Sequence, residues 1–308
     1  MHRLISNLKT TKILQKGRIS KEKMNLLINK RLLHIYMGRY LIVLMTTVMM
    51  FSVSLSGCLG DDSDESEDSE IDLIVYYDTT FGTIQENIQN NNQVSFSDVE
   101  LTFNYAYTKS DAGDITTFYF ESGDGSTRTE VDANETGEIT YNYVTHGLFT
   151  ATLGAIDDAG NDEQMTLTIR IDKTTQWSDS QTNNPNTMNI DTTPDCECNS
   201  PSKIEIFSNV TNPENPGFGV VGNGGPVTVT WYLNGSEVSR ESNSENLGEG
   251  QTASWNHNEI GPLPETWTLE VGLNHDQENV DIEHSVSIKY SSDESSPNPL
   301  PTGQTPEE

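Results

Sequence analysis

The stretch YNYVTHGLFTATLGAIDDAGN, residues 141–161, alternates apolar and polar side chains over two short runs and then ends in turn-forming residues. The apolar positions of the two runs are Tyr141, Tyr143, Phe149, Ala151 and Leu153. A period of two places successive side chains on opposite faces of a strand, so each run predicts an antiparallel strand with one buried face. The cluster Asp157–Asn161 predicts the tight turn that follows.

Runs of the same kind flank this stretch on both sides, near residues 101–107 and 165–171, whereas helical periodicity is scarce after residue 72. Several short strands separated by Gly, Asp and Asn within about a hundred residues are typical of a β-sandwich. The sequence therefore predicts an all-β fold for residues 72–173.

A turn with two glycines precedes the opening stretch, in the segment FESGDGST at residues 120–127. Gly123 and Gly125 can adopt positive φ at no steric cost, and Asp124 between them can accept hydrogen bonds from nearby backbone amides. These three residues predict a tight turn between strands, which is also the candidate ligand loop of this part of the chain.

The order and spacing of this turn, of the Tyr-Asn-Tyr and Gly-Leu-Phe strands and of the turn at 157–161 resemble the PKD (polycystic kidney disease) domain. The resemblance covers roughly residues 72–173. It implies an immunoglobulin-like β-sandwich with an extracellular interaction role. Three positions depart from the family pattern: Phe120 stands where Trp is usual, Ser122 replaces a Phe, and Tyr141 replaces a His.

The turn after the opening stretch contains a cluster of oxygen-bearing side chains, Asp157, Asp158, Asn161 and Asp162. Such side chains could gather around Ca²⁺, but their spacing does not match the EF-hand loop. Turn chemistry is the favoured interpretation, with calcium as the alternative and no other cofactor expected.

Residues 174–202 are rich in Thr, Asn, Ser and Pro, which predicts a polar linker. Cys196 and Cys198 lie within it, and in an oxidising compartment this pair predicts a disulfide. Intermolecular or free thiols are the second interpretation, and a metal site is the third because further ligands are missing.

The β pattern resumes over residues 203–290, where Trp231-Tyr232-Leu233 runs into Asn234-Gly235, a strong hairpin signal. This segment loosely resembles the CARDB type of immunoglobulin-like domain, a module related to cell adhesion. The two β segments together predict two immunoglobulin-like β-sandwich domains in tandem. The tryptophans Trp231, Trp255 and Trp267 are expected in the core, with a sugar-binding platform as the alternative.

The N-terminal 57 residues have the character of an export signal with a long basic preface, and either Met1 or Met37 could be the start. Residues 41–55 form an uncharged apolar run that is short for a membrane span and leads into Leu55-Ser56-Gly57-Cys58. These four residues resemble the lipobox of prokaryotic lipoproteins, which implies lipid on Cys58. An uncleaved signal anchor is the alternative, and both interpretations place the rest of the chain outside the membrane at the cell surface.

The net charge of −30 is unevenly distributed, because residues 1–57 carry a net +9, which leaves −39 for the remainder. Such an acidic surface excludes nucleic acid as a partner. It favours a marine or halophilic source, which we expect to be archaeal, and the alternative, compatible with the first, is that acidity only keeps an exposed protein soluble. Seven carboxylates within residues 61–70 make 58–71 an extended acidic tether. Residues 291–308, rich in Pro and acids, are expected to form a disordered tail.

Catalytic motifs are absent from the sequence: it has no His-Glu-x-x-His, no Gly-x-Ser-x-Gly and no phosphate-binding Gly-rich loop with Lys. We therefore expect no enzyme. Asn134, Asn209 and Asn234 begin sequons and are candidate glycosylation sites on an exported chain. The predicted function is a lipid-anchored surface protein that binds or adheres to a protein or polysaccharide. The alternatives are an accessory substrate-binding protein for extracellular polymer degradation and an envelope spacer.

Overall fold

The computed structural model describes residues 70–214, 225–274 and 278–302, and these residues form an all-β fold with no helix. The first half of the chain contributes β1 (Ile71–Asp72), β2 (Phe81–Gln89), β3 (Asn92–Ser97), β4 (Val99–Asn104), β5 (Lys109–Ser110), β6 (Ile115–Glu121), β7 (Thr129–Asp132), β8 (Glu138–Tyr143) and β9 (Gly147–Asp157). The second half contributes β10 (Asp162–Thr182), β11 (Met188–Asp191), β12 (Lys203–Thr211), β13 (Val227–Asn234), β14 (Ser239–Glu241), β15 (Glu245–Leu247), β16 (Thr252–Ile260), β17 (Thr266–Leu273) and β18 (Val280–Lys289).

The first sandwich packs the β4–β8 pair against the sheet formed by β7, β6, β9 and the first half of β10. Its core is aromatic: Phe103 stacks on Phe120 with ring centroids 4.6 Å apart, and Tyr143 stacks on Phe149 at 4.9 Å. The alternation predicted over residues 141–153 is confirmed at Tyr143, Phe149, Ala151 and Leu153, which are fully buried, whereas Tyr141 is only partly buried.

The second sandwich packs the sheet order β16-β12-β18-β10 against the order β11-β17-β13-β14. Trp231 and Trp267 are buried at its centre, as predicted, whereas Trp255 is only half-buried and stacks on His257 with centroids 5.0 Å apart. The predicted hairpin at Asn234-Gly235 is confirmed, since Asn234 pairs with Ser239 and Gly235 N donates to Val238 O at 2.8 Å.

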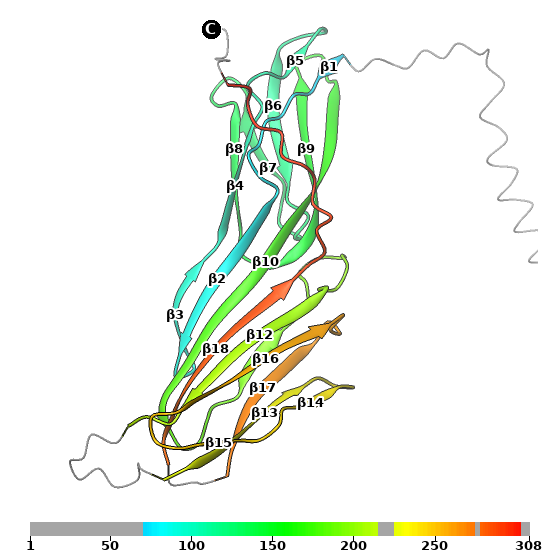
Figure 1. Ribbon diagram of the computed structural model, residues 1–308. Helices are drawn as coiled ribbons and strands as arrows, with labels where there is room; N and C mark the ends of the chain where they lie inside the picture. The colour runs from blue at the N-terminus through cyan, green and yellow to red at the C-terminus, as the bar shows by residue number, and fades with distance from the viewer. Residues whose placement is uncertain (1–69, 215–224, 275–277, 303–308) are drawn as a thin grey trace, which may run out of the picture. The chain divides into compact units, whose positions relative to one another are not determined.

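Strand β10 belongs to both sandwiches, as Figure 1 shows in the long green strand. Its residues 162–171 pair with β9, and its residues 173–182 pair with β18. On its other edge β2 runs parallel to residues 170–178. Ile169 and Ile171 therefore enter the first core, while Trp177 enters the second.

This continuity differs from the polar linker predicted for residues 174–202. Residues 174–182 lie in β10, and residues 188–191 form β11, which pairs with β17. The prediction was wrong because one side of this strand is polar: Thr174, Gln176 and Ser178 face away from the core and give the segment the composition of a linker. The alternate residues Thr175, Trp177 and Asp179 are buried. Composition alone cannot distinguish a strand with one polar face from a linker.

The C-terminal segment 291–302, here called the strap, also differs from the expected disordered tail. It leaves β18 and returns to the first sandwich, where Ser295 N donates to Thr168 O at 2.9 Å. Farther along, Asn298 and Tyr77 exchange two backbone hydrogen bonds of 2.8 and 3.1 Å. The composition of the strap, rich in acids and prolines, did not predict these contacts, because the contacts are made mainly by backbone groups.

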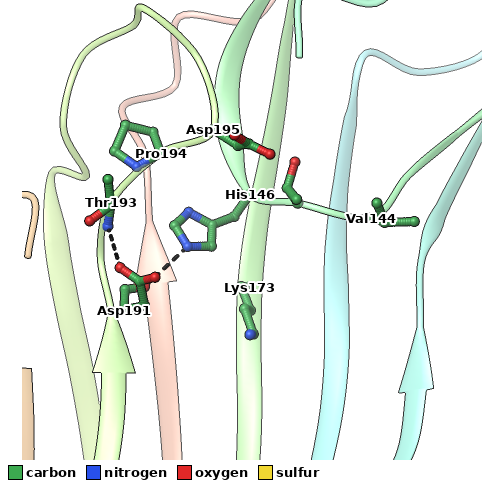
Figure 2. Close-up of a pocket in the computed structure, with 8 residues that line it drawn as sticks. Val144, His146, Lys173, Asp191, Thr193, Pro194 and Asp195 are labelled. Carbon is green, nitrogen blue, oxygen red and sulfur yellow. Dashed lines mark hydrogen bonds between the residues drawn. The ribbon is translucent and has the colours of Figure 1, made fainter. Parts of the chain in front are cut away.

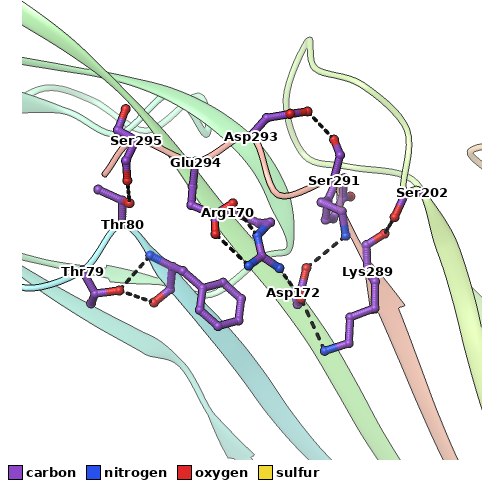
Figure 3. Close-up of polar contacts among 12 residues, drawn as sticks. Thr79, Thr80, Arg170, Asp172, Ser202, Lys289, Ser291, Asp293, Glu294 and Ser295 are labelled. Carbon is purple, nitrogen blue, oxygen red and sulfur yellow. Dashed lines mark hydrogen bonds and ion pairs between the residues drawn. The ribbon is translucent and has the colours of Figure 1, made fainter. Parts of the chain in front are cut away.

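A cluster of charged groups surrounds the point where β10 changes partner (Figure 3). Arg170 donates two hydrogen bonds of 2.8 Å to the Glu294 carboxylate of the strap and one of 2.9 Å to Asp172. Asp172 is 1% exposed, and it also accepts from Tyr290 N at 3.0 Å and lies 3.3 Å from Lys289 Nζ. The cluster therefore joins β10, the end of β18 and the strap.

Replacing Arg170 with Met should lower the free energy of unfolding by about 3 kcal/mol, because it removes the main partner of the buried Asp172 carboxylate and releases Glu294. Urea unfolding followed by tryptophan fluorescence measures this loss. The matched control is Lys203→Met, which breaks the half-exposed pair with Glu205 and should cost at most about 1 kcal/mol. Equal small losses in both variants would contradict a structural role for the cluster.

Candidate functional site

The Gly-Asp-Gly turn connects β6 to β7, and Asp124 organises it. Its Oδ1 accepts hydrogen bonds from the Ser122 hydroxyl and from Ser126 N at 2.9 Å, and its Oδ2 accepts one from the Tyr141 hydroxyl at 2.6 Å. Burial raises the pKa of Asp124, but these hydrogen bonds outweigh burial and hold the pKa below its usual value. Two of the three departures from the family pattern, Ser122 and Tyr141, thus contact the same carboxylate, which accounts for their polar character.

The two glycines of this turn have different surroundings. Gly123 has a φ of 78°, and a Cβ on it would lie 2.4 Å from the carbonyl oxygen of Thr150. Gly125 has a φ of 83°, but nothing lies within 4 Å of the corresponding position. Only Gly123 is therefore required by close packing as well as by its backbone conformation.

Gly123→Ala should destabilise the protein by about 3 kcal/mol, because left-handed strain of about 1–2 kcal/mol adds to a clash with backbone that cannot move away freely. Gly125→Ala is the matched control and should cost only the strain, about 1 kcal/mol. Thermal unfolding of both variants measures the difference. A Gly125 variant that loses as much stability as the Gly123 variant would show that crowding at Thr150 is unimportant.

The calcium candidates take part in three separate local contacts. Asp157 accepts from Asn161 N and Nδ2, both at 2.8 Å, and from Ser110 Oγ at 2.7 Å, which closes the turn. Asp158 accepts from Asp114 N at 3.1 Å, and Asp162 accepts from the Tyr119 hydroxyl at 2.8 Å. Within the described ranges, no group of three or more His, Cys, Asp or Glu side chains has the geometry of a metal site.

The remaining predicted site residues lie apart from one another. Cys196 and Cys198 are joined in a disulfide with Cα atoms 5.2 Å apart, and Cys196 packs against the first core. The sequon residue Asn134 lies in the exposed turn between β7 and β8, Asn209 lies within β12, and Asn234 ends β13. Cys58 and the apolar run at 41–55 lie outside the described ranges, and those ranges contain no helix long and apolar enough to cross a membrane.

A pocket of about 390 Å³ lies where the two sandwiches meet, beside β10 (Figure 2). His146 forms its buried wall, and Lys173, Asp191 and Asp195 line the rest. His146 Nε2 lies 3.1 Å from the Asp191 carbonyl oxygen, and its Nδ1 lies 2.8 Å from the Tyr290 hydroxyl. Because a carbonyl only accepts, Nε2 carries the proton and Nδ1 accepts from Tyr290.

Both ring nitrogens of His146 are therefore used in structural bonds, and burial lowers the pKa of this histidine. The imidazole holds the loop after β11 against the end of β18 and has no ring nitrogen left to act as a general base. The sequence patterns did not predict this pocket, because its lining residues come from three separate segments with no shared motif.

His284 is the second buried histidine, in the core of the second sandwich. Its Nδ1 lies 2.7 Å from Ser208 Oγ, which in turn accepts from Trp231 Nε1 at 2.7 Å. Its ring stacks on Trp177 with centroids 4.9 Å apart. Burial lowers the pKa of His284 to about 4, so the ring is neutral in the folded protein at neutral pH.

The folded protein should lose stability as pH falls from about 6.5 to about 4. The unfolded chain binds a proton on each histidine near pH 6.5, whereas folded His284 resists protonation until about pH 4. The stability is fully present above the unfolded pKa, and the His284 contribution to the loss approaches about 3 kcal/mol. Urea unfolding at pH 7, 5.5 and 4.5 measures the loss.

His284→Gln should flatten this pH dependence, although it lowers stability at pH 7. Asn256→Gln is the control, because it changes an exposed residue, replaces no titratable group and should keep the wild-type slope. A His284 variant with an unchanged slope would be evidence against the buried histidine as the source.

Comparison with known families matches residues 83–170 to the PKD domain. The matched segment runs from β2 into the first half of β10 and falls inside the range expected from the sequence. No curated protein matches the chain.

Three solved structures match the chain at low similarity. A structure described as a study of the promiscuous specificity of carbohydrate-binding modules of the β-sandwich superfamily is 12% identical, with a TM-score of 0.26, covering 72% of this chain and 93% of that one. Tripeptidyl peptidase 2 is 11% identical, with a TM-score of 0.21, covering 73% of this chain and 21% of that one. The secreted serine protease VesC from Vibrio cholerae is 10% identical, with a TM-score of 0.18, covering 74% and 54%. At these scores the likenesses carry no functional argument.

Proposed function

We propose that this protein is an exported, lipid-anchored surface protein that binds an extracellular protein or polysaccharide without catalysis. The match of residues 83–170 to the PKD domain carries the proposal, because PKD domains are typically extracellular interaction modules. The resemblance of residues 203–290 to CARDB domains stays a prediction and points in the same direction.

The location rests on the N-terminal pattern. Leu55-Ser56-Gly57-Cys58 follows directly on the apolar run 41–55, and the acidic residues 61–70 come next. Lipid attached to Cys58 would hold the chain at the membrane, and the like charges would keep the tether extended. The net charge beyond residue 57 gives no attraction to nucleic acid.

A binding role is favoured over catalysis by the state of the described histidines. His146 and His284 are buried with lowered pKa values, and each is hydrogen-bonded within the fold. His257 contacts the Glu259 carboxylate at 3.1 Å, which is also bound by Arg240. In these surroundings each ring has a structural partner. His284 lies beside the Ser208 hydroxyl, but both residues are fully buried and Ser208 also accepts from Trp231, so a substrate could not reach this pair.

Cells that carry the full-length protein should bind a ligand on a glycan and protein array, and should aggregate with one another if the ligand is on the cell surface. Cys58→Ser should abolish the attachment of labelled lipid while leaving ligand binding by the purified protein intact, because it removes only the acylated thiol and retains the apolar run 41–55. Lipid labelling, cell fractionation and array binding of both forms measure this. Intact unmodified protein in the cytosol, or no ligand on the array and no aggregation, would contradict the proposal.

A further inference from the structure

One face of the second sandwich is open along six strands. The strands β16, β12, β18, β10, β2 and β3 are hydrogen-bonded in that order over the second half of β10, and they lie side by side in Figure 1. The inward side chains of β16, β12, β18 and the second half of β10 enter the second core, β2 adds Ile88 to it, and β3 is exposed on both faces. The outward side chains form what we call the six-strand face.

The register places the outward side chains in rows that cross all six strands. The middle row is Asn256, Phe207, Ser285, Gln176, Asn87 and Ser95. The rows on either side are Asn258, Glu205, Ser287, Thr174, Gln85 and Ser97, and Ser254, Asn209, Glu283, Ser178, Gln89 and Asn92. None of these side chains is buried.

The chemistry of these three rows is mostly neutral and hydrogen-bonding, and Lys203 at their border pairs with Glu205 at 2.6 Å. Only Glu205 and Glu283 are charged in the three rows, and no Lys or Arg occurs there. Amide and hydroxyl side chains offer both donors and acceptors, and they lose less on leaving water than charged groups do. The ligand that matches them is one that also presents uncharged donors and acceptors, which is the chemistry of a polyhydroxylated polymer.

Cross-strand hydrogen bonds hold several of these side chains in place before any ligand arrives. Gln176 Nε2 donates to Ser285 Oγ at 2.8 Å, and Ser254 Oγ donates to Asn209 Oδ1 at 2.6 Å. Thr174 and Ser287 hydroxyls lie 2.8 Å apart. Binding to such a surface orders few side chains, which lowers its entropic cost.

Phe207 stands in the middle row and is 47% exposed, although it belongs to a strand inside the sheet. An exposed aromatic ring offers an apolar face against which the C–H side of a sugar ring can pack, while the surrounding amides bind its hydroxyls. The combination of one aromatic ring with a neutral polar border fits a sugar better than a protein.

The size and twist of the six-strand face indicate which kind of ligand it can bind. Five strand spacings of about 4.8 Å and two steps of about 6.7 Å along the strands give an area of roughly 300 Å². A stable protein partner covers about 800 Å² on each side, so the three rows alone would be only part of such an interface. A twist of about 20° per strand turns the face by roughly 100°, which prevents a flat crystalline surface from touching all of it.

We propose that the six-strand face binds a single uncharged polysaccharide chain. This inference rests on the proposed function and names the ligand class and the surface that takes it. A chain of sugars can follow a twisted surface and makes many weak contacts. Because it is uncharged, the carboxylates of Glu205 and Glu283 do not repel it. Repetition along the polymer compensates for the small area, because a released chain rebinds through its neighbouring units.

The test measures retardation of the full-length protein in native gels that contain a soluble neutral polysaccharide: a β-glucan, a xylan, a galactomannan or an α-glucan. Alginate serves as the anionic comparison. The protein is made in a host without N-glycosylation, because a glycan on Asn209 would cover the face. The wild type should be retarded by at least one neutral polymer and not by alginate.

Phe207→Ala should weaken this binding about fivefold, and the double variant Gln176→Glu with Ser285→Glu should weaken it at least tenfold by adding charges that must lose water. Gln176→Ala, which adds no charge, should have a smaller effect than the double variant. Thr150→Glu, at an exposed position on the first sandwich, should bind like the wild type. Unchanged unfolding midpoints show that the variants are folded.

Retardation that is equal in the wild type and in the face variants would overturn this inference, and so would stronger binding to alginate than to every neutral polymer. If the array identifies a ligand but the face variants still bind it, the inference fails while the proposed function stands. If neither the array nor the gels reveal a ligand, both fail.

Discussion

The hydrogen-bonded continuity of β10 is the constraint on which the rest of the structure depends. A single strand of 21 residues supplies Ile169 and Ile171 to one core and Trp177 to the other. Its backbone groups pair with β9, β18 and β2 in turn, and leaving such groups unpaired inside a sheet would be costly. The two cores are therefore joined by sheet hydrogen bonds and not by a flexible connection.

Where a strand changes its pairing partner, the polar groups at that point need other hydrogen-bond or charge partners. Here Arg170, Asp172 and Glu294 do this at the point where β9 ends and β18 begins, and the strap brings Glu294 there. Burying Asp172 would be unfavourable without Arg170, Lys289 and the Tyr290 amide around it. The same junction contains the pocket of His146, so the polar residues between the cores are mostly occupied with holding the strands together.

The local patterns of the sequence predicted the strands well. Alternation over residues 141–153, the Gly-Asp-Gly turn and the Asn-Gly hairpin each depend on residues close together in the chain, and each is present in the fold. The pairing of β10 with three different strands, the return of the strap and the rows of the six-strand face depend on residues that can be more than two hundred positions apart. No local pattern contains such information. The polar composition of residues 174–182 even favoured a linker over a strand, because one side of that strand faces solvent.

The strap brings the C-terminal end of the described chain back to the beginning of the first sandwich. The polypeptide leaves the first sandwich along β10, builds the second, and comes back so that Asn298 pairs with Tyr77, near the first of the described residues. The second sandwich is thus an insertion within the first, because segments of the first sandwich both precede it and follow it in the chain. Neither half could be exchanged by simple recombination of gene fragments, because a cut after β10 would also strip the first half of its final segment.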